Sequence, residues 1–270
     1  METTKAIAHL SSVDSYDVER YLCYFNHITP KNTVEVFKRW LFSYASVHTT
    51  WKLNCKLYYA LADLQWMGDP PELARRIKDS GAGMHNKRFA YISAFTDFFW
   101  KHPLWFNHSA HESWEAYRQR LEHITPGIGF AKSAFGIEMM YPESARVVCT
   151  DTHILQLYGY STGDIKDGKI PRKIMTKIQA HWVDTCVSRE IPPVAARWIY
   201  WDRKQKQSGC RYWTCVFEKE NYNERLGQLA RHPQRPAAVA RHIDSAPARK
   251  DSSVPTVHEA IPHAALLGRT

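Results

Sequence analysis

The sequence contains no run of 18 consecutive apolar residues, and its opening stretch, METTKAIAHL, has no apolar core of signal-peptide length. A membrane-spanning helix needs about 20 mainly apolar residues, and a secretory signal needs an apolar core of about 7 to 15. These absences argue against an integral membrane protein and against a secreted one. We therefore expect a soluble protein with no membrane partner that acts inside a cell, in the cytoplasm, nucleoid or nucleus.

Cysteine is sparse and has no ligand-like spacing. Of the six cysteines only Cys210 and Cys215 are close in sequence, and neither a Cys-x-x-Cys pair nor a Cys/His quartet occurs. Zinc and iron–sulfur sites need such clusters, and proteins inside cells keep their thiols reduced. We expect free thiols, no metal site and no cofactor.

Strand-like alternation is also nearly absent, whereas helical periodicity runs through most of the chain. Apolar residues recur at three- and four-residue spacing in the segments 17–28, 33–47, 51–64, 86–102, 113–124, 130–140, 171–188 and 193–204. Further helices are expected from Pro71 to Gly81 and from Thr152, and an extended stretch over 145–149. The pattern predicts an all-α fold of about ten helices.

Positive charge and aromatic side chains are what the chain has in excess. There are 36 Lys and Arg against 27 Asp and Glu, which is compatible with a polyanionic partner such as nucleic acid. Aromatic residues make up 13% of the chain and support a substantial core. We expect an N-terminal helical extension over 1–30, a folded domain over 31–224, and a flexible basic tail over 225–270 that is rich in Pro, Ala, His and Arg.

Two neighbouring segments carry features that point to chemistry. ITPGIGFAKSAF (124–135) places Gly127 and Gly129 between two helices, where backbone N–H groups and a helix N-terminus can bind a phosphate. CTDTHILQL (149–157) places Asp151 at the start of the next helix. The first segment also suits a plain tight turn, and Asp151 also suits a plain helix cap.

The order of these parts resembles the helix–hairpin–helix DNA glycosylase superfamily (HhH-GPD), which includes endonuclease III and adenine glycosylase. Its members carry an LPGVG-type hairpin, a hydrophobic helix and then Val-Asp-Thr-His; this chain reads ITPGIGFAKSAFGIEMMYPESARVVCTDTHILQLYG. The segments LFSYASVHTTWKLNCKLY (41–58), IKDSGAGMHNKRFAYI (77–92) and RWIYWDRK (197–204) are similar to further family segments in the same order. The resemblance covers roughly residues 35–218 and implies a two-lobed, all-α glycosylase-like fold.

The chain also departs from the family pattern. Bifunctional members place a Schiff-base lysine two residues after the second glycine, where this chain has Ala131; Lys132 follows, about 100° further around the helix. The family's intercalating glutamine corresponds to Tyr44. The iron–sulfur loop of endonuclease III has no counterpart. The departures imply a relative without the cluster and without Schiff-base lyase activity.

The resemblance implies a monomeric enzyme that binds double-stranded DNA, flips a modified or damaged base out of the stack and cleaves its N-glycosidic bond. Asp151 would stabilise positive charge on the sugar or activate water, and Lys132 is the second catalytic candidate. The implied DNA contacts are Gly127, Ile128, Gly129, Lys132 and Tyr44, and the implied base-pocket residues are His153 and Trp51.

Several alternatives stay open. Lys132 also suits a phosphate contact or a solvated lysine, and Tyr44 also suits a core ring. For the whole chain, the alternatives are a virus-encoded enzyme of DNA base hypermodification, which transfers a group to an activated pyrimidine, and a DNA-binding module without catalysis.

Overall fold

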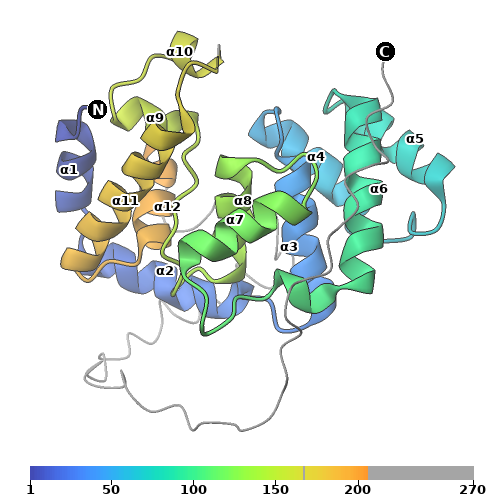
Figure 1. Ribbon diagram of the computed structural model, residues 1–270, viewed down its shortest axis with the longest axis horizontal. Helices are drawn as coiled ribbons and strands as arrows, with labels where there is room; N and C mark the ends of the chain where they lie inside the picture. Colours follow the sequence, from blue (N-terminus) through green and yellow to red (C-terminus); the bar gives the residue numbers. More distant parts are fainter. Residues whose placement is uncertain (167, 206–270) are drawn as a thin grey trace, which may run out of the picture. The chain divides into compact units, whose positions relative to one another are not determined.

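The computed structural model describes residues 1–166 and 168–205, which form twelve α-helices, one 3₁₀ helix and no strand (Figure 1). The prediction of an all-α fold is confirmed. No helix in this part of the chain is long and apolar enough to cross a bilayer. The expected tail over 225–270, and Cys210 and Cys215, lie outside the described residues.

The helices follow one another in the order α1 (Thr4–Ser11), α2 (Ser15–Ile28), α3 (Thr33–Ala45), α4 (Trp51–Leu61), α5 (Pro70–Ser80), α6 (His85–Lys101), the 3₁₀ helix η1 (Pro103–Phe106), α7 (Trp114–Ile124), α8 (Phe130–Met140), α9 (Thr152–Leu157), α10 (Thr162–Lys166), α11 (Arg172–Ser188) and α12 (Pro193–Lys204).

Most helix starts were predictable because a side chain next to the helix accepts a hydrogen bond from its first turn. Asn32, Asp69 and Ser113 do so for α3, α5 and α7. The sequence prediction missed α1 and α10. Both are short: α1 makes about two helical turns and α10 little more than one, so the apolar repeat on which the prediction depends has little room to recur.

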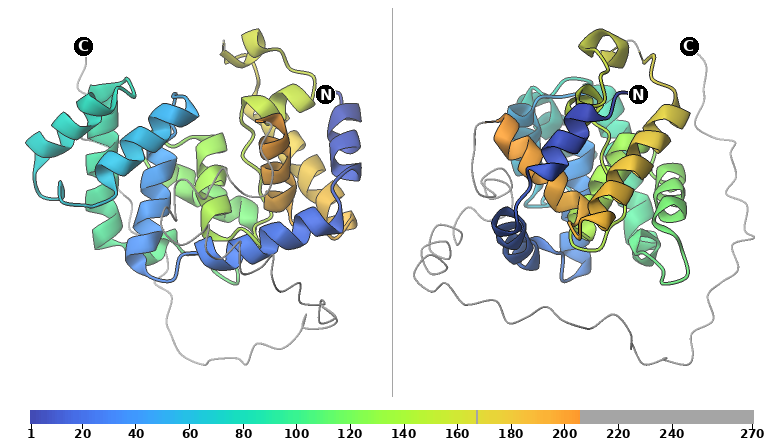
Figure 2. Two further views of the ribbon diagram at one scale, coloured as in Figure 1. Left: turned by 180° about the vertical axis from the view of Figure 1, so that it is seen from behind. Right: turned by 90° about the vertical axis from the view of Figure 1, so that its left-hand side faces the viewer.

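Two hydrophobic clusters hold the described helices together. The larger cluster is built from α2 to α8 and the smaller one from α1, α9 and α11. Helix α12 contributes Trp198 to the first and Ala196 to the second. Figure 2 shows α1, α11 and α12 side by side. Residues 1–30, predicted as an extension, therefore supply side chains to both clusters.

The segment 145–149 passes between the two clusters. Its residues alternate: Val147 and Cys149 belong to the larger cluster and Val148 to the smaller one. This is the alternation of an extended chain, although the segment pairs with no strand. Asp151 follows two residues after Cys149.

Helix α8 lies unusually close to α3. A Cβ atom at Gly136 would approach Cη2 of Trp40 to 2.6 Å, so only glycine allows the indole to lie on α8. One turn earlier, Ser43 Oγ donates a hydrogen bond to the carbonyl oxygen of Lys132 at 2.9 Å. The contact fixes the first turn of α8, which follows the predicted hairpin.

Candidate functional site

Asp151 is the N-cap of helix α9. Its Oδ1 accepts hydrogen bonds from the backbone N–H groups of His153 and Ile154, both at 3.0 Å. Its Oδ2 accepts a hydrogen bond from Nη2 of Arg197 at 2.7 Å. The side chain keeps 20% of its surface exposed. Asp151 therefore caps the helix, and its side chain is not fully enclosed by protein.

Arg197 connects Asp151 to a second carboxylate that the sequence analysis missed. Nη1 of Arg197, on α12, donates to Oε2 of Glu138, on α8, at 2.8 Å. Oε1 of Glu138 accepts a hydrogen bond from the backbone N–H of Cys149 at 2.6 Å. Glu138 is fully buried and Arg197 nearly so. A sequence signal existed for both, since each is the lone charged residue in an apolar or aromatic run, in GIEMM and AARWIYW.

The three groups shift one another's ionisation. Burial would raise the pKa of Asp151, but the charge of Arg197 and the N–H of Ile154 bring that pKa below its ordinary value. Burial raises the pKa of Glu138 to about 7, although Arg197 opposes the rise. Asp151 is therefore ionised at neutral pH, and Glu138 is the carboxylate that takes up a proton first.

Lys132 lies in the first turn of α8, close enough to Asp151 for the two charges to interact. Burial lowers the pKa of its ammonium group, and the neighbouring Cys149 and Asp151 oppose that change. Nζ lies 5.1 Å from the centroid of the Phe135 ring. Among the described residues no carboxylate forms an ion pair with this amine. The charges of Lys132 and Asp151 therefore influence each other.

The predicted hairpin joins α7 to α8 through a tight turn. Gly127 has φ of +81°, and the N–H of the buried Ile128 donates to the carbonyl oxygen of Thr125 at 3.1 Å. Gly129 precedes α8 in an extended conformation and is exposed. Within the described chain the N–H groups of Gly129 and Phe130 donate no hydrogen bond. These N–H groups are available to an anion.

The two hairpin glycines have different surroundings. A Cβ atom at Gly127 would lie 2.3 Å from Cδ2 of Tyr91, whereas a Cβ at Gly129 would meet nothing within 4 Å. Two interpretations of both glycines were open from the sequence, the approach of a phosphate and a plain tight turn. For Gly127 the structure shows a left-handed turn packed against Tyr91.

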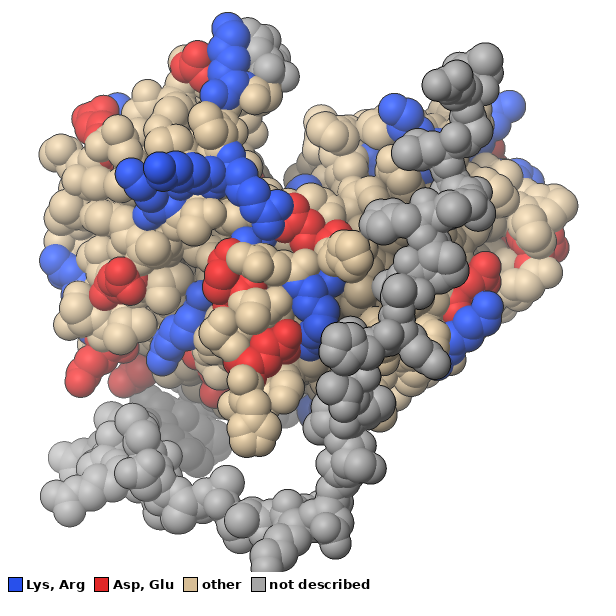
Figure 3. Space-filling view, viewed as in Figure 1, with Lys and Arg blue, Asp and Glu red and all other residues tan. Residues whose placement is uncertain are grey.

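Basic side chains lie next to the hairpin on α11. Arg172 forms a two-fold ion pair with Glu122 of α7, at 2.7 and 2.8 Å, and its guanidinium carbon lies 5.5 Å from the centroid of the Phe130 ring. Lys173 and Lys177 are exposed. In Figure 3, Lys and Arg side chains gather over this helix. Two exposed lysines therefore lie on the same helix as Arg172, whose own charge is paired with Glu122.

The prediction that Tyr44 enters a base stack is wrong for this conformation. Only 2% of Tyr44 is exposed, and its ring lies 4.7 Å from that of Phe95 in the larger cluster. All of α3 from Arg39 to Ala45 is buried. A helix buried all round has no face left for a ligand, so the alternative of a plain core ring is correct.

The two predicted base-pocket residues occupy different surroundings. His153 stacks edge-on against Trp201 with ring centroids 4.3 Å apart, and burial lowers the pKa of its imidazole. The backbone N–H of His153 donates to Asp151, so the two residues are adjacent in the structure. Trp51 opens helix α4 and packs against Phe42 of the larger cluster. The described contacts do not join Trp51 to His153.

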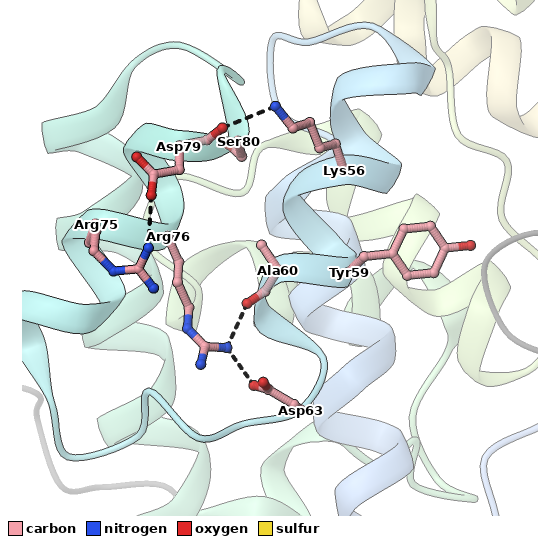
Figure 4. A pocket seen from close by; sticks show the side chains of 8 residues that line it. All are labelled: Lys56, Tyr59, Ala60, Asp63, Arg75, Arg76, Asp79 and Ser80. Atoms are coloured by element: carbon pink, nitrogen blue, oxygen red, sulfur yellow. Dashed lines mark hydrogen bonds and ion pairs between the residues drawn. The ribbon is translucent and has the colours of Figure 1, made fainter.

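A surface pocket between α4 and α5 contains none of the predicted site residues (Figure 4). Its charged groups satisfy one another: Arg75 binds Asp79, Arg76 binds Asp63, and Lys56 donates to a backbone oxygen. Within residues 1–166 and 168–205 no group of three or more His, Cys, Asp or Glu side chains is arranged to hold a metal ion. The cluster around Asp151 therefore remains the best candidate site.

Comparisons of the chain with family models, with curated proteins and with solved structures found no match.

Proposed function

We propose that this protein is a DNA N-glycosylase-like enzyme that acts on a flipped, modified or damaged base in duplex DNA. The observation that carries the proposal is the position of Asp151. Asp151 is ionised, its side chain is partly exposed, and it lies within electrostatic reach of Lys132. Lys132 itself lies in the helical turn directly after a hairpin with free N–H groups.

The surface around the hairpin supports a DNA partner. The free N–H groups of Gly129 and Phe130 lie at the N-terminus of α8, where the helix dipole favours a phosphate. Lys173 and Lys177 add exposed positive charge on α11. Contacts of this kind hold a duplex without reading its sequence.

The chemistry needs the negative charge of Asp151. When the bond between C1′ of the deoxyribose and the base breaks, the base leaves with the bonding electrons and the sugar becomes positively charged. A fixed carboxylate lowers the energy of that cation. A water molecule then adds to C1′ and gives up a proton, and the departing base takes up a proton, so the products are an abasic site and the free base.

Lys132 has a supporting role in this proposal. Ala131 occupies the position of the lysine that forms a Schiff base in bifunctional relatives, so we propose base removal without strand cleavage. The amine of Lys132 has no carboxylate partner among the described residues, and it contributes positive charge where the DNA backbone enters.

The proposal is tested by incubation of the full chain with duplexes that carry a panel of modified and damaged bases. Each duplex is scored for abasic sites by alkaline cleavage and for mass gain on the base. Abasic sites that appear with the wild type and fall at least a hundredfold with Asp151→Asn support the proposal; two orders of magnitude require only about 2.7 kcal/mol. Mass gain on the base without abasic sites would contradict base removal and would indicate a base transferase instead.

Asp69→Asn is the matched control. Asp69 is also a helix N-cap and accepts a hydrogen bond from the N–H of Glu72 at 3.0 Å. Asparagine caps helices about as well as aspartate, so neither variant loses a cap. Equal activity of Asp151→Asn, Asp69→Asn and the wild type on an identified substrate would show that Asp151 is only a cap.

A further inference from the structure

Glu138, Arg197 and Asp151 form a line that runs from the interior to the surface. The exposed fraction of the side chain rises from 0% at Glu138 to 8% at Arg197 and 20% at Asp151. One guanidinium joins the two carboxylates, with one terminal nitrogen for each. Only the Asp151 end of this line can meet a ligand.

We propose that Glu138 and Arg197 are positioning residues for Asp151, and that through them Asp151 acts as a fixed anion toward the sugar rather than as a base. The part of this inference that concerns catalysis rests on the proposed function. The part that concerns the orientation and ionisation of Asp151 does not.

The geometry leaves Asp151 little freedom. Oδ1 accepts two backbone N–H groups and Oδ2 accepts Arg197, so three donors already hold the carboxylate. Glu138 also acts through the backbone. It accepts the N–H of Cys149, whose carbonyl oxygen in turn accepts the N–H of Asp151 at 2.8 Å. Glu138 therefore fixes both the side chain and the backbone of Asp151.

The charge balance explains why a buried glutamate is present. Arg197 alone would neutralise the negative charge that Asp151 offers to a developing cation. With Glu138 ionised, the three groups together carry one net negative charge, because the second carboxylate compensates the guanidinium. A buried carboxylate is costly unless it is paired and hydrogen-bonded, and Glu138 satisfies both conditions.

The same contacts argue against a basic role for Asp151. A base must accept a proton near neutral pH, whereas the donors around Asp151 stabilise its ionised form. The other titratable groups that face the three residues include Lys132, Cys149, His153 and Tyr200, and burial followed by the charge of Asp151 raises the pKa of the Tyr200 hydroxyl. Burial raises the pKa of the Cys149 thiol to about 12 and lowers the pKa of the His153 imidazole, so it favours the neutral form of both groups.

One arm of the test needs no DNA. The side-chain carboxyl of Asp151 is observed by ¹³C NMR as a function of pH and assigned by its loss in Asp151→Asn. We expect its midpoint below 3.8 in the wild type and at least one unit higher in Arg197→Gln. Arg197→Lys keeps the charge but cannot bridge both carboxylates, so an intermediate midpoint is expected even if Arg197→Gln does not fold. A midpoint that is the same in wild type and both folded variants overturns the role of Arg197.

The second arm uses two duplexes, one with a cationic pyrrolidine at an abasic position and one with a neutral tetrahydrofuran. The ratio of their dissociation constants measures how strongly the site favours a positive sugar. We expect the wild type to bind the cationic duplex more tightly, and Glu138→Gln to lower the preference about tenfold at pH 8.5. The wild-type preference should fall from pH 8.5 to 6.5 as Glu138 takes up a proton, and Glu138→Gln should lack this change.

Asp202→Asn is the matched control for the loss of one buried carboxylate. Asp202 also lies on α12 but accepts a hydrogen bond from Tyr21, so its loss should leave the preference unchanged. A Glu138→Gln variant with the wild-type preference and pH dependence overturns the role of Glu138. A wild type without preference overturns the fixed-anion role. If the wild type binds neither duplex, the proposed function is wrong, and the NMR titration alone then decides the role of Arg197.

Discussion

The ring of Tyr91 lies directly against Gly127, where a Cβ atom would sit 2.3 Å from Cδ2 of that ring. Tyr91 belongs to α6 and Gly127 to the turn between α7 and α8, so the contact joins the hairpin to the larger hydrophobic cluster. Gly129, two residues later, has open space in the corresponding direction. The first glycine is thus needed for packing, and the second leaves the helix start accessible.

Alanine should therefore have unequal effects at the two glycines. Gly127→Ala combines a left-handed backbone with a collision, and we expect a loss of about 2 to 4 kcal/mol in the free energy of unfolding. Gly129→Ala should cost about 1 kcal/mol or less, and under the proposed function its methyl group should also weaken DNA binding. Urea denaturation measures the first effect and fluorescence anisotropy the second. Equal destabilisation by the two variants would contradict the packing role of Gly127.

Lys173 and Lys177 should contribute to DNA affinity and to its dependence on salt. If each contacts one phosphate, Lys173→Gln with Lys177→Gln should reduce the slope of log K against log salt by about 1.8, or 0.9 per contact. The measurement is a titration of one duplex at several salt concentrations.

The control for this double variant is Lys31→Gln with Lys101→Gln, which changes the net charge equally. Both lysines are exposed. Lys31 precedes the N-terminus of α3, whereas Ser43, which contacts Lys132, lies near the C-terminus of that helix. Lys101 is the last residue of α6 and follows Tyr91 by ten residues. Identical slopes for the two double variants would show that only net charge matters.

Removal of the Tyr44 hydroxyl should leave both stability and DNA binding nearly unchanged. This hydroxyl has no hydrogen-bond partner among the described residues, so Tyr44→Phe loses no protein hydrogen bond. Tyr117 is equally buried, but its hydroxyl donates to the carbonyl oxygen of Phe106. Tyr117→Phe should therefore cost about 1 kcal/mol. A DNA-binding defect in folded Tyr44→Phe would contradict the assignment of Tyr44 to the core.

His9 should make the protein less stable in acid. Its Nε2 lies 2.9 Å from the carbonyl oxygen of Ala196, and burial lowers the pKa of the imidazole to about 4. The unfolded chain binds a proton near pH 6.5 and the folded chain only near pH 4, so stability is lost as pH falls through this range. The loss should approach about 3 kcal/mol.

His9→Gln keeps an N–H donor and replaces the imidazole with an amide, which does not titrate. Urea denaturation at pH 7 and at pH 4.5 should therefore show a smaller difference for the variant than for the wild type. Glu138 acts in the opposite direction, since its raised pKa favours the folded state at lower pH. Glu138 is present in both proteins, so the difference between them isolates His9. The same pH dependence in both proteins would exclude His9 as its source.

The sequence by itself determined the helical class, most helix boundaries, the turn at Gly127 and the position of Asp151 at a helix start. These features depend on residues within about one helical turn of each other, such as Asp69 before α5 or Ser113 before α7. Local hydrogen bonds and apolar spacing are enough to predict them.

Only the tertiary structure decided which side chains meet. Arg197 lies 46 residues from Asp151 and 59 from Glu138 along the chain, and no local pattern connects the three. The burial of Tyr44 and the stacking of Tyr91 on Gly127 depend in the same way on neighbouring helices. A helical repeat indicates that one face is buried but not which partner covers it, because the partner is set by the packing of helices that the chain brings together over long distances.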